Sequence, residues 1–377
     1  MDLTTLITAV GLLFGVIVGN AAIFGNALYV NMTIPKQLES SGLSQSTVEQ
    51  VFVAEINRYI ENPSIVPTPS VSTSSASGLP MALAKPLQLQ DVVYSVQSMI
   101  HDYGVVHVDA SLVADAQGAG LHMYLVMSNP PDPPISMSLA EPDGNAKVLI
   151  EKAARETMTA IGPFRVAITD FKDGVAGDPT AFDRCKQTIA TGLAQGWDPR
   201  PLGATEDVLL FNLKGVLAIR DGNLVEAAKD FTQARNIPGG YAGAYGVVAL
   251  NQAFLAIAEK QPKEAAFRYN EGVPYVSTLS KTGVQARLAT IAGLLAWAEG
   301  QNAVAERDFR AAIANSDTDP MPHLYLAQLL AAHGDAALAA TERQAASDVE
   351  RYDPGYRSLA FSNFQFDLTG GGYKPMF

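Results

Sequence analysis

The chain begins with a long run of residues that carry no charge. From Leu3 to Val30 there are 28 consecutive residues without Asp, Glu, Lys or Arg. A helix of that length spans about 42 Å, whereas the hydrocarbon core of a bilayer is about 30 Å thick. The pattern predicts an N-terminal transmembrane helix, and we expect residues 1–33 to form a membrane anchor.

Two features of this run leave alternatives open. A cleaved signal peptide is also apolar, but it usually follows basic residues, and only Asp2 precedes this stretch. Gly11, Gly15 and Gly19 share one face of the predicted helix, and small residues at this spacing allow a second membrane helix to approach closely. The spacing predicts either packing on a partner helix in the membrane or simply a helix rich in small residues.

The charges beside the run give little guidance on its orientation. Lys36 follows it and no basic residue precedes it, which slightly favours a cytoplasmic C-terminal part. A single N-terminal anchor is, however, a common way to display a large domain outside the cytoplasm. We expect a single-pass membrane protein whose remaining part lies outside the cytoplasm.

Residues 34–173 combine strand and helix patterns. Apolar and polar residues alternate over 106–112 and 121–127, which predicts a β-hairpin with one apolar face, and a third strand is expected at 135–139. Residues 62–86 are rich in Pro, Ser and Thr and are expected to form an extended loop. Helical patterns occur at 45–61, 90–102, 145–161 and 163–173. Together these features predict a small α+β domain.

A pattern of small and aromatic residues recurs between positions 206 and 350. The two clearest copies use the same offsets: Gly215, Ala227, Phe231 and Ala234, then Gly293, Ala305, Phe309 and Ala312. Weaker copies are marked by Ala253 and Ala327, so the four markers are 38, 40 and 34 residues apart. A period of this length with two helical patterns per unit predicts an array of paired helices.

The residue types fit such an array. Small residues allow two helices to pack closely, and Gly222, Gly300 and Gly334 stand where the first helix of a unit must end. The pattern resembles the tetratricopeptide repeat (TPR) family over about 145 of the 377 residues. Three positions depart from that family: Lys214 stands where a leucine is usual, Lys260 stands at the turn of the second unit, and Arg343 takes the aromatic place. An ordinary alanine-rich helical bundle is the alternative.

The resemblance implies an all-α, TPR-like array over residues 174–358, followed by an aromatic tail at 359–377. In the family, groove-facing residues lie one and four places after the small marker residue of each first helix. Carried over to this chain, the partner-binding groove is formed by Val216, Ile219, Phe254, Ile257, Leu294, Trp297 and Gln328. A mostly apolar groove suits an amphipathic helix or apolar peptide of a partner, unless the chain fills it with its own α+β domain or its tail.

Composition excludes several classes of protein. With 48% hydrophobic and 17% charged residues the chain is not disordered, and a net charge of −12 without a basic patch argues against nucleic-acid binding. The single cysteine, Cys185, forbids an internal disulfide, and we expect it to be a core residue.

Candidate chemistry is sparse. His107 and His122 share the polar face of the predicted hairpin. The expected strand pairing separates them by about five residues along the ladder, on the order of 17 Å, which is too far for a shared metal ion. We found no phosphate-binding glycine loop, nucleophile elbow or paired-histidine zinc motif. We therefore predict no catalytic residues, no metal site and no cofactor.

These patterns favour a membrane-anchored scaffold or accessory subunit that binds protein partners in a membrane or envelope complex. Two other hypotheses stay open. One is an enzyme with a site on the α+β domain around His107, Asp109 and His122. The other is a secreted chaperone-like binder whose N-terminal run is a cleaved signal peptide.

Overall fold

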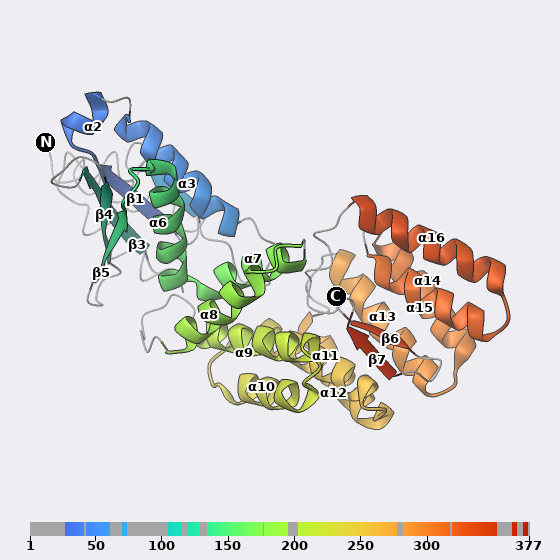
Figure 1. The fold of residues 1–377 in the computed structure, drawn as a ribbon. Coiled ribbons are helices and arrows are strands. Elements are labelled where there is room, and N and C mark those ends of the chain that lie inside the picture. Colours follow the sequence, from blue (N-terminus) through green and yellow to red (C-terminus); the bar gives the residue numbers. More distant parts are fainter. Residues whose placement is uncertain are drawn as a thin grey trace, which may run out of the picture. The chain divides into compact units, whose positions relative to one another are not determined.

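The computed structural model describes most of the chain as two compact units (Figure 1). The first unit holds the described residues up to Val166 together with Gly203, and the second holds those from Ala167 onward. The described residues are 27–40, 43–60, 70–73, 105–114, 120–128, 134–175, 177–194, 203–276, 282–316, 319–352, 364–367 and 372–375.

The first unit is built on a five-stranded sheet with the order β2-β1-β3-β4-β5. Strand β1 runs parallel to both of its neighbours, whereas β3, β4 and β5 are antiparallel. The strands are β1 (Ala27–Thr33), β2 (Ser70–Thr73), β3 (Val105–Ala114), β4 (Leu121–Ser128) and β5 (Ile135–Glu141). A short helix, α2 (Lys36–Ser40), follows β1.

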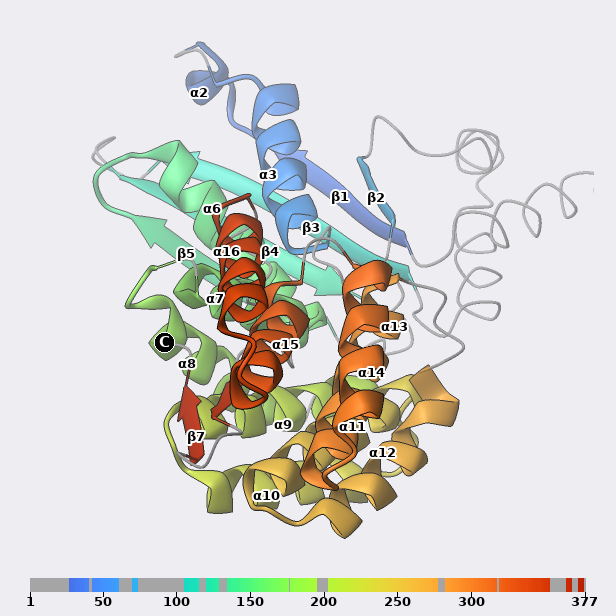
Figure 2. The ribbon, with the colours of Figure 1, turned by 90° about the vertical axis from the view of Figure 1, so that its right-hand side faces the viewer.

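Two longer helices, α3 (Gln45–Ile60) and α6 (Ala146–Ile161), cover one face of this sheet (Figure 2). Alternate strand residues point towards them, and Val30, Val108 and Leu125 are fully buried there. The Asn145 side chain caps α6 by accepting the Val148 N–H, and Phe52 of α3 fills the core beneath. The predicted hairpin is present as β3 and β4, and the predicted third strand is present as β5.

The prediction of an N-terminal transmembrane helix is wrong. Residues 27–30, the end of the predicted helix, belong to strand β1 in the interior of the sheet. Leu28, Val30 and Met32 are buried on one face while Tyr29 is only half-buried, so the period here is two and not 3.6. A lack of charge suits a buried strand as well as a membrane helix, and only the alternation separates the two.

The prediction of a single-pass membrane protein depended on that helix and is also wrong. Within the described ranges, no helix combines the length and the apolar character that crossing a membrane requires. Residues 1–26 lie outside the described part, and so do Gly11, Gly15 and Gly19, which were expected to pack on a second membrane helix.

The long Pro/Ser-rich loop is also interrupted. Residues 70–73 form strand β2, which pairs with β1 in the register Ala27–Ser70 to Val30–Thr73. A four-residue strand of this kind depends on the neighbouring strand for all its inter-strand hydrogen bonds, so the local sequence pattern does not predict it. The helix expected at 90–102 lies outside the described residues.

The second unit is almost entirely helical. Helix α7 (Pro163–Val175) leads into it, followed by α8 (Ala181–Ala194). Four helix pairs come next: α9 (Gly203–Arg220) with α10 (Leu224–Asn236), α11 (Ala242–Ala258) with α12 (Pro262–Val276), α13 (Thr282–Ala298) with α14 (Asn302–Asn315), and α15 (Pro320–Ala332) with α16 (Ala336–Tyr352). Strands β6 (Phe364–Asp367) and β7 (Gly372–Pro375) form a hairpin, and β6 contacts α15.

The first helix of every pair ends in the same cap. The N–H that closes each cap bonds to the carbonyl five positions earlier, at 2.8–2.9 Å: Asn223 to Ala218, Gln261 to Ala256, Gln301 to Ala296 and Asp335 to Leu330. The residue before each donor has a positive φ, and these residues are Gly222, Lys260, Gly300 and Gly334. This is a Schellman cap, repeated at the predicted spacings of 38, 40 and 34 residues.

The small marker residues explain why the helices of a pair pack so closely. A Cβ atom added to Gly215 would lie 2.5 Å from the Phe231 ring, and one added to Gly293 would lie 2.6 Å from the Phe309 ring. Both rings are fully buried. The helical C-terminal half thus fits a TPR-like repeat array, as the sequence pattern predicts.

Candidate functional site

The predicted groove residues lie mainly inside the array. The side chains of Val216, Ile219, Phe254, Ile257 and Leu294 are buried. Trp297 is half-buried, and its ring meets the edge of Phe309 with the ring centroids 6.3 Å apart. Gln328 is also half-buried. A role for these seven residues in partner binding stays a prediction, with Trp297 and Gln328 the two that retain accessible surface.

The polar residues of the sheet do not gather around one point. Strand pairing places His122 beside Val113 and His107 beside Ser128, at opposite ends of the β3–β4 ladder. The His107 ring stacks on Tyr29, and burial lowers its pKa although Asp109 acts in the other direction. Asp109 accepts a hydrogen bond of 2.9 Å from Asn31. This arrangement gives no support to an active site on the sheet, and no metal-binding cluster occurs in the part of the chain that the structure describes.

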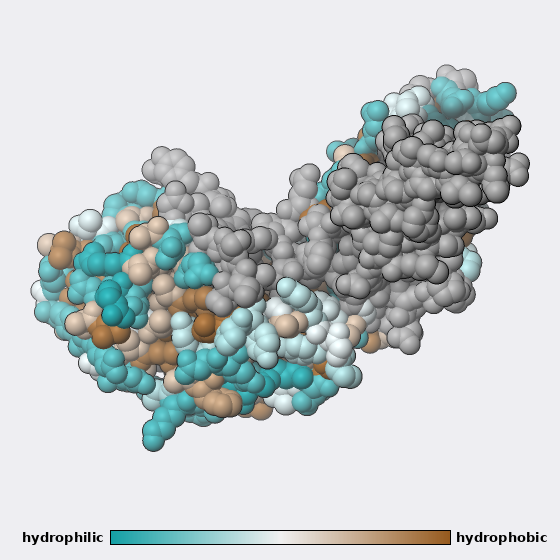
Figure 3. Space-filling model, turned by 180° about the vertical axis from the view of Figure 1, so that it is seen from behind, coloured by the Kyte–Doolittle hydropathy of each residue, from teal (hydrophilic) through white to brown (hydrophobic). Residues whose placement is uncertain are grey.

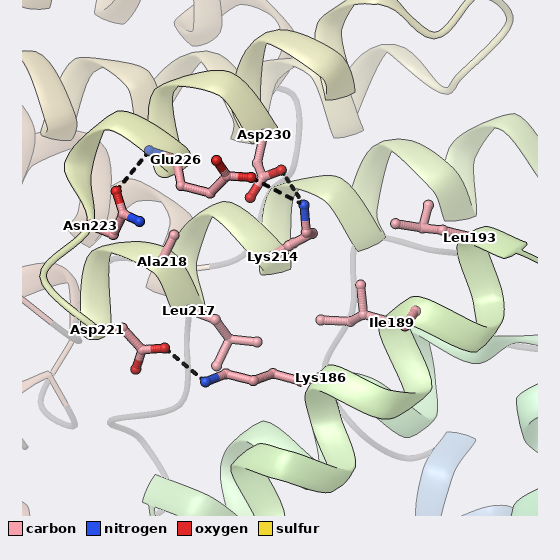
Figure 4. A pocket seen from close by; sticks show the side chains of 11 residues that line it. Lys186, Ile189, Leu193, Lys214, Leu217, Ala218, Asp221, Asn223, Glu226 and Asp230 are labelled. Carbon is pink, nitrogen blue, oxygen red and sulfur yellow. Dashed lines mark hydrogen bonds and ion pairs between the residues drawn. The ribbon is translucent and has the colours of Figure 1, made fainter.

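A pocket of about 360 Å³ opens in the second unit where α8 meets the first repeat (Figure 4). Helix α8 supplies one wall, and α9 and the start of α10 supply the other. Its lining residues are Lys186, Ile189, Ala190, Leu193, Lys214, Leu217, Ala218, Asp221, Asn223, Glu226 and Asp230.

Helix α8 is held in place by its contacts with α7. The Cys185 thiol is buried and donates to the Ala167 carbonyl at 3.1 Å, which agrees with the predicted core role of this cysteine. Arg184 pairs with Asp178 at 2.8 Å and with Asp170 at 3.5 Å. The hydrogen bond from Arg184 is the main reason why the pKa of Asp178 falls to about 2. These contacts position α8, which supplies the apolar wall of the pocket.

The walls are apolar and the charges lie at two ends. Ile189 and Leu193 of α8 face Leu217 of α9 across the pocket (Figure 4). At one end Lys186 bonds to Asp221 at 2.8 Å, with both side chains partly exposed. A surface pair of this kind contributes little to stability, so it is free to rearrange when a ligand binds.

At the other end of the pocket one lysine lies beside two carboxylates. The Lys214 ammonium lies 2.7 Å from Asp230 Oδ1 and 3.6 Å from Glu226 Oε1. Lys229 also bonds to Glu226, at 3.0 Å, and this contact is the main reason why the pKa of Glu226 is lowered. Glu226 lies in the first turn of α10, where a carboxylate is favoured by the helix dipole and Asn223 supplies the cap.

Asp230 is the unusual member of this end. Its side chain is 0% exposed, whereas that of its partner Lys214 is 40% exposed. Among the described residues, no hydrogen-bond donor reaches the second oxygen, Asp230 Oδ2, which is buried. Desolvation raises the pKa of Asp230, and the hydrogen bond from Lys214 only partly opposes that effect. A buried acceptor without a donor is costly, because it has lost its water without replacement.

A second pocket, of about 320 Å³, contains a carboxylate whose two oxygens both accept hydrogen bonds. It lies between α10, α11 and α12 and is lined by Arg235, Tyr245, Glu271 and Tyr275 among others. Both oxygens of Glu271 accept from Arg235, and Arg268 adds a third contact at 3.1 Å. No acceptor of that carboxylate is left over, so the pocket at α8 is the stronger candidate for ligand binding.

Sequence reasoning found only part of this site. It singled out Lys214 as a departure from the TPR pattern but assigned no role to Lys186, Glu226 or Asp230. A usable signal was present. Lys214 and Asp230 immediately precede Gly215 and Phe231, which must touch in a paired-helix repeat, so the two charged residues must be neighbours. The contribution of α8 could not be foreseen, because α8 precedes the repeats.

No family model and no curated protein sequence matches this chain. Among solved structures it is similar to BtubC (BKLC) from P. vanneervenii, with a TM-score of 0.37 and 18% identity, over 54% of this chain and 88% of that one. It is also similar to a MamA RS-1 ArsTM double mutant, with a TM-score of 0.31 and 14% identity, over 50% of this chain and 96% of that one. At these TM-scores the likenesses carry no argument about function.

Proposed function

We propose that this protein is an interaction scaffold that binds a protein partner through its helical repeats. In this proposal the pocket formed by α8, α9 and α10 receives an anchoring side chain of the partner. The observation that carries the proposal is the pocket itself, which combines apolar walls with a buried, incompletely bonded carboxylate. Ligand sites typically join a mostly apolar lining to a few polar groups that fix orientation.

The surface around the array supports recognition at a pocket. On the face seen in Figure 3, hydrophobic residues outside the grey atoms lie in small groups among hydrophilic ones. The large apolar side chains that are exposed in the second unit, such as Val225, Phe267 and Leu338, belong to different helices. Interface energy concentrates in a few anchors that fill pockets, so a broad apolar face is not required.

Binding rather than catalysis is the function we infer for this pocket. Its lining in the described chain includes no Ser, Thr, Cys or His that would serve as a nucleophile or as a proton shuttle near neutral pH. Its lysines and carboxylates pair with one another at the two ends.

The test is a peptide-display selection against the full chain, followed by affinity measurements on two matched variants. Ala190 is exposed and lines the pocket, so Ala190→Trp should block its mouth without disturbing the core. Ala194 is also exposed and lies one turn further along α8, outside the pocket lining, so Ala194→Trp is the control. Selected peptides should bind Ala190→Trp at least about tenfold more weakly, since losing an anchor costs about 1.4 kcal/mol or more.

Two results would contradict this proposal. One is a selection that enriches no peptide sequence against the full chain. The other is a selected peptide that binds Ala190→Trp, Ala194→Trp and the unchanged chain with equal affinity.

A further inference from the structure

The bonding of Asp230 identifies the chemistry of a ligand for the α8–α10 pocket. Its Oδ1 accepts from Lys214, and its buried Oδ2 has no donor among the described residues. The missing group is therefore an N–H or O–H donor. The carboxylates of Asp221 and Glu226 are paired with cations of the chain, so Asp230 Oδ2 is the acceptor that a ligand would complete, and a cationic N–H group makes the strongest bond to it.

Lys214 is an incomplete partner for this carboxylate. An ammonium is a compact point charge, and here it serves one oxygen of Asp230. A guanidinium presents two parallel N–H groups that match the two oxygens of a carboxylate, which is the geometry of a bidentate pair. The chain already uses this solution in its second pocket, where Arg235 donates to both oxygens of Glu271.

The apolar walls suit the rest of such a side chain. Ile189, Leu193 and Leu217 flank the route to the charged end, and long cationic side chains bury their methylene stems along apolar surface. The volume of about 360 Å³ leaves room for the stem and the planar head together.

We propose that the pocket receives an arginine side chain of the partner, that its guanidinium bonds to both oxygens of Asp230, and that Lys214 holds this place until the partner binds. This inference rests on the proposed scaffold function and names the residue type that the site recognises. Lysine fits the same place less well, because it again serves a single oxygen.

The test uses capped tripeptides, N-acetyl-Ala-Xaa-Ala-amide, with arginine, lysine, norleucine or glutamate at the central position. Their affinities for the full chain are measured by calorimetry. We expect arginine to bind most tightly, then lysine, with norleucine and glutamate at least roughly tenfold weaker than arginine, because a hydrogen bond to a charged group is involved. Added salt should reduce the advantage of arginine over norleucine.

Two variants in the repeats separate the role of Asp230 from a general effect of charge. Asp230→Asn should weaken arginine binding roughly tenfold or more, while leaving norleucine binding unchanged. Asp308→Asn alters the aspartate at the same offset in the third repeat, outside the pocket lining, and should change neither affinity. If Asp230→Asn does not fold, Lys214→Met provides the second test. It removes the occupant and keeps an apolar stem, so the arginine peptide should bind more tightly.

The peptide affinities distinguish failure of the arginine inference from failure of the scaffold proposal. Equal affinity for arginine and norleucine, with both lost in Ala190→Trp, would overturn the arginine inference and leave the scaffold proposal standing. Tightest binding of the glutamate peptide would make the lysines the recognition groups and would also overturn it. Peptide binding that is unaffected by Ala190→Trp would remove the scaffold proposal for this pocket together with the inference.

Discussion

The first repeat (α9 and α10) and the third repeat (α13 and α14) have matching interiors. Gly215 packs on Phe231 in one, and Gly293 packs on Phe309 in the other, sixteen residues later in both cases. The alanines at the matching offsets, Ala227 and Ala234 against Ala305 and Ala312, are all fully buried. The two helix pairs therefore rely on the same small-to-aromatic contact.

Two of the three positions just before these interior residues differ, and the third is an aspartate in both repeats. The first repeat has Lys214, Glu226 and Asp230, and the third has Ala292, Val304 and Asp308. Asp308 is partly exposed and pairs with its own neighbour Arg307 at 2.8 Å, whereas Asp230 is buried beside the pocket. The interior positions maintain the repeat, and the adjacent positions are therefore free to carry a binding site.

Truncation of the buried aromatic residues tests the interior that the two repeats share. Phe231→Ala and Phe309→Ala should each lower the free energy of unfolding by about 3–5 kcal/mol, because each leaves a cavity in a fully buried site. Chemical denaturation of both variants measures the two costs. A cost below about 1 kcal/mol for one of them would show that the two interiors are not equivalent.

The next effect concerns the glycines opposite these rings. Gly215→Ala and Gly293→Ala place a methyl group 2.5 or 2.6 Å from a buried ring, so something must shift. Overpacking costs about 1–3 kcal/mol, and the better helix propensity of alanine returns at most about 1 kcal/mol. Thermal melting should show a loss of stability in both variants. Stabilisation of either variant would mean that the ring opposite the glycine can move away from the added methyl group without loss of packing.

A pH series tests the difference between the repeats. Burial raises the pKa of Asp230, so over the interval between its unfolded and folded values the native state binds more protons than the unfolded state. Its contribution to stability is full below the unfolded pKa and is lost as pH rises through the folded one. Asp230→Asn removes this pH dependence, so the variant should gain stability relative to the unchanged chain as pH rises from the ordinary aspartate pKa through the raised folded pKa. Parallel stability curves would contradict the assigned cause.

The smallest effect extends the comparison to the second repeat, which has Lys260 where the others have glycine. Lys260 has a φ of 60°, a conformation that costs an L-residue roughly 1–2 kcal/mol, while the flexibility of glycine in the unfolded chain offsets part of any gain. Lys260→Gly should therefore stabilise the protein by about 0.5–1 kcal/mol in chemical denaturation. Gly300→Lys should lower the free energy of unfolding by a similar amount. A Gly300→Lys variant as stable as the unchanged chain would show that the cap tolerates either residue.

The sequence predicted the features that depend on local periods. The hairpin of β3 and β4 follows from the alternation around Val108 and Leu125, and the repeats follow from the spacing of Gly215, Gly293 and their weaker copies. The failures have non-local causes. Strand β1 ends an uncharged run, and its identity as a strand depends on pairing with β2 and β3, which follow it at a distance along the chain.

The candidate site was less predictable than the fold for a similar reason. Lys214 and Asp230 lie on adjacent helices of one repeat, so the repeat pattern alone brings them together. The pocket also needs Ile189 and Leu193 of α8, and nothing in the sequence states which helix covers the open side of the first repeat. Val216 and Leu294 of the family-based groove are buried in the array, and their role in partner binding stays a prediction.

Methyl NMR of the full chain, titrated with a peptide selected by display, shows whether the partner binds at the first repeat. Leu217 lines the pocket of the first repeat, and Leu295 occupies the same offset in the third. If the first repeat carries the binding site, the methyl signals of Leu217 and Leu193 shift with peptide concentration, while those of Leu295 stay in place. Shifts at Leu295 that equal those at Leu217, or shifts at neither, would contradict the assignment of this pocket as the partner-binding site.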